Sequence, residues 1–211
     1  MTTTPPDVST HPVERALEEI DGLLDGLVQQ PAWSMNATER ARVQVLTTKM
    51  RNKLAGFFLG TVAQADRSDD ATALGATNTA GLLRSHFPVS GPQARRTVRL
   101  ARAIESYPVT ERALSTGALA PDQAAAITGA VDALPTEHRL AAEAHLVALA
   151  AEHDAAALKV LGKHVLEVVA PDQADAILGT RLEAEEAKAA RTTYLELHDD
   201  GQGRCLSLIH I

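Results

Sequence analysis

The chain has 211 residues, of which 45% are hydrophobic and 3% aromatic, with one cysteine and a formal net charge of −7. A single cysteine excludes an internal disulfide framework and a cysteine-only zinc site. No apolar run approaches the ~20 residues of a membrane span, and the polar N-terminus lacks the apolar core of a signal peptide. We therefore expect a cytoplasmic protein of about one domain. It should be rich in helix, because 38 residues are alanine, the best helix former.

Charge is distributed unevenly along the chain. Residues 40–102 contain eleven basic and three acidic residues, a net charge of +8. The rest of the chain contains nine basic and twenty-four acidic residues, a net charge of −15. A basic segment between acidic flanks indicates either an anionic partner or pairing of the chain with itself, and both alternatives stay open at this point.

In chain order, residues 1–11 are expected to be a disordered leader and residues 12–190 a helical domain. After Pro12, apolar residues recur at helical spacing from Val13 to Leu27, a pattern that predicts an amphipathic helix. Asn36 is the expected cap of a long helix that continues to about Asp66. A loop is expected over residues 67–77.

Capping residues and prolines predict the later helices. The expected segments begin at Asn78, Ser90, Pro108 and Pro121, and then cover residues 135–153, 154–170 and 171–190. The predicted fold class is therefore all-α, a multi-helix alanine-rich bundle.

From residue 191 the pattern becomes that of a β-hairpin, with alternating β-rich residues followed by turn residues. We expect residues 191–211 to be the start of a hairpin in a truncated chain. The last six residues, Leu206–Ile211, also match what one reading frame of a transposon mosaic-end sequencing adaptor encodes. We expect them to be an artefact, and a native second strand is the alternative.

Residues that could bind a metal or catalyse a reaction lack the necessary spacing. His138, His145 and His153 are expected on one helix, but steps of seven and eight residues place them roughly 10–12 Å apart along its axis. Two zinc ligands on one helix need i, i+3 or i+4 spacing. No Gly-x-Ser-x-Gly and no phosphate-binding glycine loop occurs. We predict no catalytic and no metal-binding residue in this chain.

Arginines form the one candidate site. Arg95, Arg99 and Arg102 recur at i, i+4 and i+7 on one helix face, with Arg96 beside them and Arg84 on the preceding short helix. A short helix, a tight turn and a basic second helix form the outline of a helix-turn-helix, whose second helix enters the major groove of DNA. Guanidinium groups suit phosphates and guanine edges. The alternative is a solvated face that pairs with acidic residues of the flanking helices.

A family resemblance is most specific in residues 107–124, which read Tyr-Pro-Val-Thr-Glu-Arg-Ala-Leu-Ser-Thr-Gly-Ala-Leu-Ala-Pro-Asp-Gln-Ala. This segment resembles the signature of the bacterial domain of unknown function 222, in which a Pro-led helix ends in Ala-Leu-x-x-Gly before a capped helix. Residues 142–150 and the step Pro171–Asp172 are similar to later segments of that family, and the resemblance covers residues 40–205. Tyr107 stands where leucine is common, and Ala120 replaces the usual Ser or Thr cap.

Proteins that resemble this family typically carry the helical domain before an HNH endonuclease domain, in which a histidine activates water and a divalent metal stabilises the leaving oxygen. The resemblance implies a non-catalytic helical domain that positions a nuclease domain on DNA, with the divalent metal held by that nuclease domain. No asparagine follows Asp172, so no catalytic residue is carried over. A structural or self-association module with no nucleic-acid role is the alternative.

Overall fold

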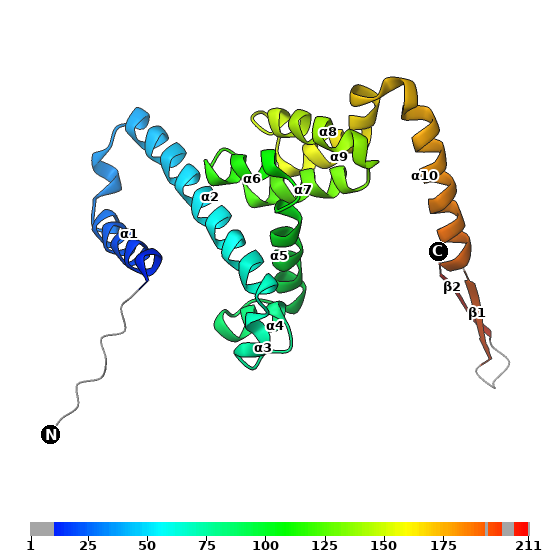
Figure 1. Ribbon diagram of the computed structural model, residues 1–211, viewed down its shortest axis with the longest axis horizontal. Helices are drawn as coiled ribbons and strands as arrows, with labels where there is room; N and C mark the ends of the chain where they lie inside the picture. Colours follow the sequence, from blue (N-terminus) through cyan, green and yellow to red (C-terminus); the bar gives the residue numbers. More distant parts are fainter. Residues whose placement is uncertain (1–10, 193, 200–204, 211) are drawn as a thin grey trace. The chain divides into compact units, whose positions relative to one another are not determined.

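The computed structural model describes residues 11–192, 194–199 and 205–210, drawn in colour in Figure 1. The chain divides into two compact units, residues 1–48 and 49–211, and each is described by itself. The predicted leader lies outside the described residues except for His11.

The first unit contains α1 (Pro12–Val28), the 3-10 turn η1 (Ala32–Ser34) and the beginning of α2 (Ala37–Arg67). Asn36 caps α2 as predicted. Its side-chain Oδ1 accepts a hydrogen bond from the Glu39 backbone amide at 3.0 Å, and the Asn36 backbone amide donates to Glu39 Oε2 at 2.8 Å. These reciprocal bonds form a capping box. The predicted helix of the first unit is present, but no residue of α1 is buried.

Helices form the body of the second unit, which confirms the prediction of an all-α fold. They are α3 (Asp70–Ala73), α4 (Thr79–His86), α5 (Gly91–Ile104), α6 (Pro108–Ser115), α7 (Pro121–Asp132), α8 (Thr136–Leu149), α9 (Ala155–Val169) and α10 (Pro171–Thr192). Beyond α10, β1 (Tyr194–Asp199) and β2 (Cys205–His210) pair antiparallel, with Tyr194 opposite His210. The turn residues 200–204 lie outside the described residues, and truncation of the chain stays a prediction.

Two expectations about the helices are wrong. The predicted loop over residues 67–77 contains α3, a single turn at whose start the Thr72 hydroxyl donates to Asp69 Oδ1 at 3.0 Å. His153 does not share a helix with His138 and His145, because α8 ends at Leu149. Instead, the Gln123 side-chain amide donates to the carbonyl of Ala150 at 2.9 Å and to that of His153 at 2.8 Å. These two bonds fix the end of α8 to the start of α7.

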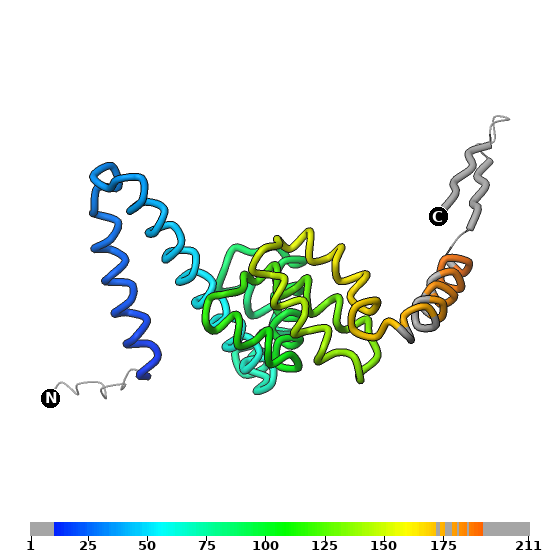
Figure 2. Tube along the Cα trace, turned by 90° about the horizontal axis from the view of Figure 1, so that it is seen from above, coloured from blue at the N-terminus to red at the C-terminus, as the bar shows by residue number. Residues whose placement is uncertain are grey.

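Helix α7 is central to the packing, since it contacts α5, α6, α8 and α9 (Figures 1 and 2). Its residues Ala124, Ile127 and Val131 are fully buried at i, i+3 and i+7, so one stripe faces the core. Small residues allow α9 to approach closely. A Cβ atom at Gly162 would lie 2.5 Å from Ala130 Cβ, so only glycine fits this crossing.

Gly117 follows the end of α6 and packs against α2, and this position needs to be glycine for two reasons. Its φ of +76° lies in the left-handed region, and an added Cβ would lie 2.4 Å from the Lys49 carbonyl oxygen. The Asn52 side-chain amide donates to the Gly117 carbonyl at 3.3 Å. The residue that was predicted to close α6 therefore also holds α2 against it.

A buried carboxylate caps α6 from another helix. Tyr107, the N-cap residue, makes no side-chain cap bond. Glu143 of α8 is almost completely buried, and its Oε1 accepts a hydrogen bond from the Thr110 amide at 2.7 Å. This satisfies one of the amides that the first turn of a helix leaves without an intrahelical partner.

Candidate nucleic-acid interface

The α4–α5 pair has the predicted outline of two helices joined by a tight turn. Asn78 Oδ1 accepts from the Gly81 amide at 2.9 Å, and Ser90 Oγ accepts from the Gln93 amide at 3.3 Å, so both helices have the predicted caps. In the turn, the ring of Phe87 packs edge-to-face on that of Phe58, with centroids 6.1 Å apart. This contact attaches the turn to α2.

Helix α5 has one buried face and one basic face. Ala94, Val98 and Ala101 are buried, and each is followed in the sequence by an exposed arginine. Since successive helical residues are rotated by about 100°, burial of the apolar stripe directs Arg95, Arg99 and Arg102 to one side of α5.

The arginine groove lies between α4 and α5 and has a volume of about 880 Å³. Four of the five candidate arginines line it, namely Arg84, Arg95, Arg99 and Arg102. The fifth, Arg96, is exposed but does not line this groove. The three arginines of α5 that the spacing puts on one helix face therefore line the same groove, and Arg84 of α4 lies in that groove as well.

Two guanidinium groups converge at the start of α5. The position of a Cβ atom at Gly91 lies 3.3 Å from Arg95 Nη1 and 4.0 Å from Arg84 Nη1. Neither arginine forms a hydrogen bond or ion pair with another described residue. Both positive charges thus lie next to the same point of the backbone, where they repel each other, and an anion bound there would offset that repulsion.

Arg102 differs from the other arginines of the groove because it is already paired. Its Nε donates to Asp66 Oδ2 at 2.6 Å, and its Nη2 donates to Asp66 Oδ1 at 2.8 Å. The hydroxyl of Thr79 also donates to Asp66 Oδ1, at 2.7 Å. The Arg102 hydrogen bonds are the main cause that lowers the pKa of Asp66. Pairing with the flanking helices thus holds for Arg102, but not for Arg84, Arg95 or Arg99 among the described contacts.

A second carboxylate, Asp132, also lines the arginine groove. It accepts a hydrogen bond from the hydroxyl of Tyr107. Burial of Tyr107, together with this bond to a carboxylate, raises the pKa of the phenol to about 12. The side chain of Arg139 donates to the Asp132 and Leu134 carbonyls at 3.0 and 2.9 Å. This network fixes the end of α7 at the groove.

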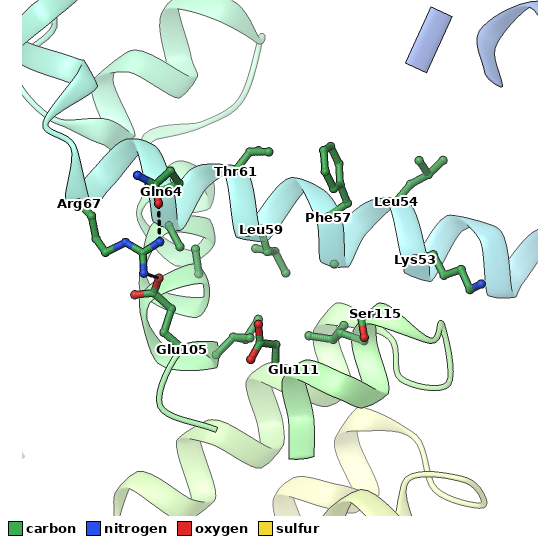
Figure 3. Close-up of a pocket in the computed structure, with 16 residues that line it drawn as sticks. Lys53, Leu54, Phe57, Leu59, Thr61, Gln64, Arg67, Glu105, Glu111 and Ser115 are labelled. Atoms are coloured by element: carbon green, nitrogen blue, oxygen red, sulfur yellow. Dashed lines mark hydrogen bonds and ion pairs between the residues drawn. The ribbon is translucent and has the colours of Figure 1, made fainter. Parts of the chain in front are cut away.

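A second groove, of about 810 Å³, lies between α2, α5 and α6 (Figure 3). Leu59 points into it, while Arg67 at one end forms an ion pair with Glu105. Its charged groups are of both signs and partly paired, so this groove lacks the excess of positive charge that recognises an anion.

Neither a cluster of metal-ligating side chains nor a membrane-spanning helix is found in the part of the chain that the structure describes. No group of three or more His, Cys, Asp or Glu side chains there could hold a metal ion. The divalent metal that the resemblance implies for a nuclease domain therefore has no fitting donor set among these residues. No described helix is both long and apolar enough to cross a membrane.

Comparison with protein families decides the assignment. The profile described as "Domain of unknown function (DUF222)" matches residues 34–207. The chain belongs to the DUF222 family. The predicted family is thereby confirmed, and the match begins six residues before the expected start at Arg40. No curated protein and no solved structure matches the chain.

In this DUF222 domain, sequence reasoning missed the two acidic residues of the arginine groove. Asp66 is the last acidic residue of a helix that ends 24 residues before Gly91, and Asp132 lies at the end of α7. Neither position carries a local signal, because only the packing of α2 and α7 against α5 brings them to the groove.

Proposed function

We propose that this DUF222 domain binds the phosphate backbone of duplex DNA through the arginine groove, and so positions a nuclease domain on its substrate. The convergence of Arg84 and Arg95 at Gly91, without an acidic partner among the described residues, is the observation that carries the proposal. Arginine forks bind phosphate oxygens in a bidentate manner, and the N-terminus of α5 adds a favourable partial positive charge.

The proposed contact is with the backbone rather than with base edges. Phosphate contacts position a protein on DNA without reading its sequence. Asp66 and Asp132 also line the groove and would repel a phosphate chain close to them. The proposal therefore places the phosphate at Gly91, where Arg84 and Arg95 converge, with Arg99 in the same groove.

The experiment compares affinities for a fluorescent duplex at low salt. The triple variant Arg84→Ala/Arg95→Ala/Arg99→Ala should bind at least about tenfold more weakly than the unmodified chain, since it loses three phosphate contacts. Arginine and alanine have similar helix propensities, so the fold should persist, and circular dichroism checks this.

A charge-matched control is available in the same unit. Arg112, Lys159 and Lys163 are exposed and lie outside the arginine groove. Their simultaneous replacement by alanine removes the same total charge and should leave affinity within about threefold, the effect of screened remote charges. Equal losses in both triple variants would refute a localised interface at the arginine groove.

A further inference from the structure

We propose that α1 of one chain packs against α2 of a second copy of the same chain, so that the protein forms a two-fold dimer. The inference concerns a different surface from the arginine groove and does not depend on DNA binding.

Helix α1 presents an exposed apolar face. Val13, Leu17, Leu24 and Leu27 are all exposed, and no residue of α1 is buried. Their spacing gives the stripe of a helix that packs on another element. Because most of the stability of a helix in a protein comes from packing of its amphipathic face, such a helix depends on a packing partner.

Helix α2 presents a second apolar stripe on the side away from its core contacts. The exposed members of this stripe are Val43, Leu46, Met50, Leu54 and Phe57. Figure 3 shows Leu54 and Phe57 pointing away from α5 and α6, whereas Leu59 points toward them. Leu54 and Phe57 also line the second groove, so the stripe borders the face by which α2 contacts α5 and α6.

The two stripes match in length. Each covers fourteen residue steps, from Val13 to Leu27 on α1 and from Val43 to Phe57 on α2. At about 1.5 Å per residue, both are roughly 21 Å long. One stripe can therefore cover the other from end to end.

The two helices also have complementary charge. Helix α1 contains five acidic residues and one basic residue, a net charge of −4. Residues 37–57 of α2 contain five basic residues and one acidic residue, a net charge of +4. Asp21 and Asp25 lie beside the stripe of α1, one helical turn apart. Lys49 and Lys53, also one turn apart, lie between the stripe of α2 and Gly117, whose added Cβ would be 2.8 and 3.0 Å from their Cγ atoms. Opposite charges that border an apolar seam select the partner helix.

A second copy is the occupant that these features favour. Within the chain, α1 is followed by the ordered 3-10 turn and capping box of residues 32–39, and in this arrangement Val43 and Leu46 stay exposed. In a two-fold dimer each α1 meets the other copy's α2, so the same contact is made twice.

Charge exchange between two variants of the full chain provides the test. The first variant is Lys49→Glu/Lys53→Glu, and the second is Asp21→Lys/Asp25→Lys. Each alone should dimerise on the order of tenfold to a hundredfold more weakly than the unmodified chain, because like charges then border the seam. An equimolar mixture should recover dimerisation, since both contacts of the mixed dimer are again between opposite charges. Sedimentation velocity measures all three samples.

The apolar part is tested by a matched pair of substitutions. Leu46→Asn should weaken the dimer, whereas Val45→Asn should not, because Val45 is similarly exposed (68% against 59%) but lies on another face of α2. An unmodified chain that is monomeric at micromolar concentration would overturn the proposal. A mixture that fails to recover the dimer would also overturn it, and would point to α1 covering its own chain.

Discussion

Arg102 and Asp66 form a bidentate ion pair that joins the end of α5 to the end of α2, with bonds of 2.6 and 2.8 Å. The arginine side chain is 64% exposed, while the aspartate is 17% exposed. The pair neutralises one cation of the arginine groove. Arg84, Arg95 and Arg99 are therefore the arginines of the groove that remain available to attract an anion.

Replacing Asp66 by asparagine should strengthen DNA binding. The substitution releases Arg102 for a phosphate and removes a repelling carboxylate, so the salt dependence of binding should steepen by up to about 0.9 in log units. Loss of an ion pair whose arginine is largely exposed and whose aspartate is mostly buried should lower the free energy of unfolding by about 1 kcal/mol. Fluorescence anisotropy at several salt concentrations measures the first effect, and urea unfolding the second. Weaker binding by a folded Asp66→Asn variant would contradict this view of the groove.

The Tyr107–Asp132 contact predicts a loss of stability at high pH. The pKa of Tyr107 in the folded chain is about 12, above the ordinary value of 10.0. The neutral phenol therefore stabilises the fold fully below pH 10, and this contribution disappears as the pH rises from 10 to about 12. A Tyr107→Phe variant has no phenol to ionise, and at neutral pH it should lose about 1 kcal/mol for the missing hydrogen bond.

Urea unfolding of both proteins across that alkaline window provides the measurement. The free energy of unfolding should fall more steeply with pH for the unmodified chain than for Tyr107→Phe. Parallel curves would show that Tyr107 ionises as easily in the folded as in the unfolded chain.

Glu143 should be important for stability because it caps α6. Glu143→Ala leaves the buried Thr110 amide without an acceptor, at a cost of about 1–3 kcal/mol. Glu143→Gln keeps a carbonyl oxygen at the same place, so its free energy of unfolding should fall clearly less than that of Glu143→Ala. Denaturant unfolding distinguishes the two variants. Equal losses would mean that the acceptor bond contributes nothing beyond the packing of the side chain.

Two glycines should respond in opposite ways to alanine. Gly117→Ala should destabilise the chain by at least about 2 kcal/mol, because it combines a positive φ with a clash against the Lys49 carbonyl. Gly129 lies within α7, and a Cβ atom there has no neighbour within 4 Å. Gly129→Ala should therefore stabilise the chain by about 0.5–1 kcal/mol. Thermal unfolding of the two variants checks both signs, and a neutral Gly117→Ala would refute the close α2–α6 crossing.

Local signals were sufficient to predict most helices. Asn78, Ser90 and Asp154 act as caps in the structure because capping depends only on the next three residues. The i, i+4, i+7 spacing likewise places Arg95, Arg99 and Arg102 in one groove. The single turn α3 escaped prediction, since four residues are too few for a periodic pattern.

Relationships between distant segments were not predictable in this way. Pairing of Arg102 with Asp66 spans 36 residues, and the contact of Glu143 with Thr110 spans 33. Both depend on how helices pack, for which a single sequence carries no direct signal. Ala120 is a local case by contrast. It lacks a capping side chain, and Gln123, three residues later, has an Oε1 that accepts from the Ala120 amide at 2.9 Å.

The salt dependence of duplex binding tests the central claim most directly. Each phosphate contact contributes about 0.9 to the slope of log K against log salt concentration. The slope of Arg84→Ala/Arg95→Ala/Arg99→Ala should therefore be shallower than that of the unmodified chain by about two to three. The triple variant of Arg112, Lys159 and Lys163 should keep the original slope. An unmodified chain that does not bind duplex DNA at ~50 mM salt, or a slope that the groove variant leaves unchanged, would contradict the account.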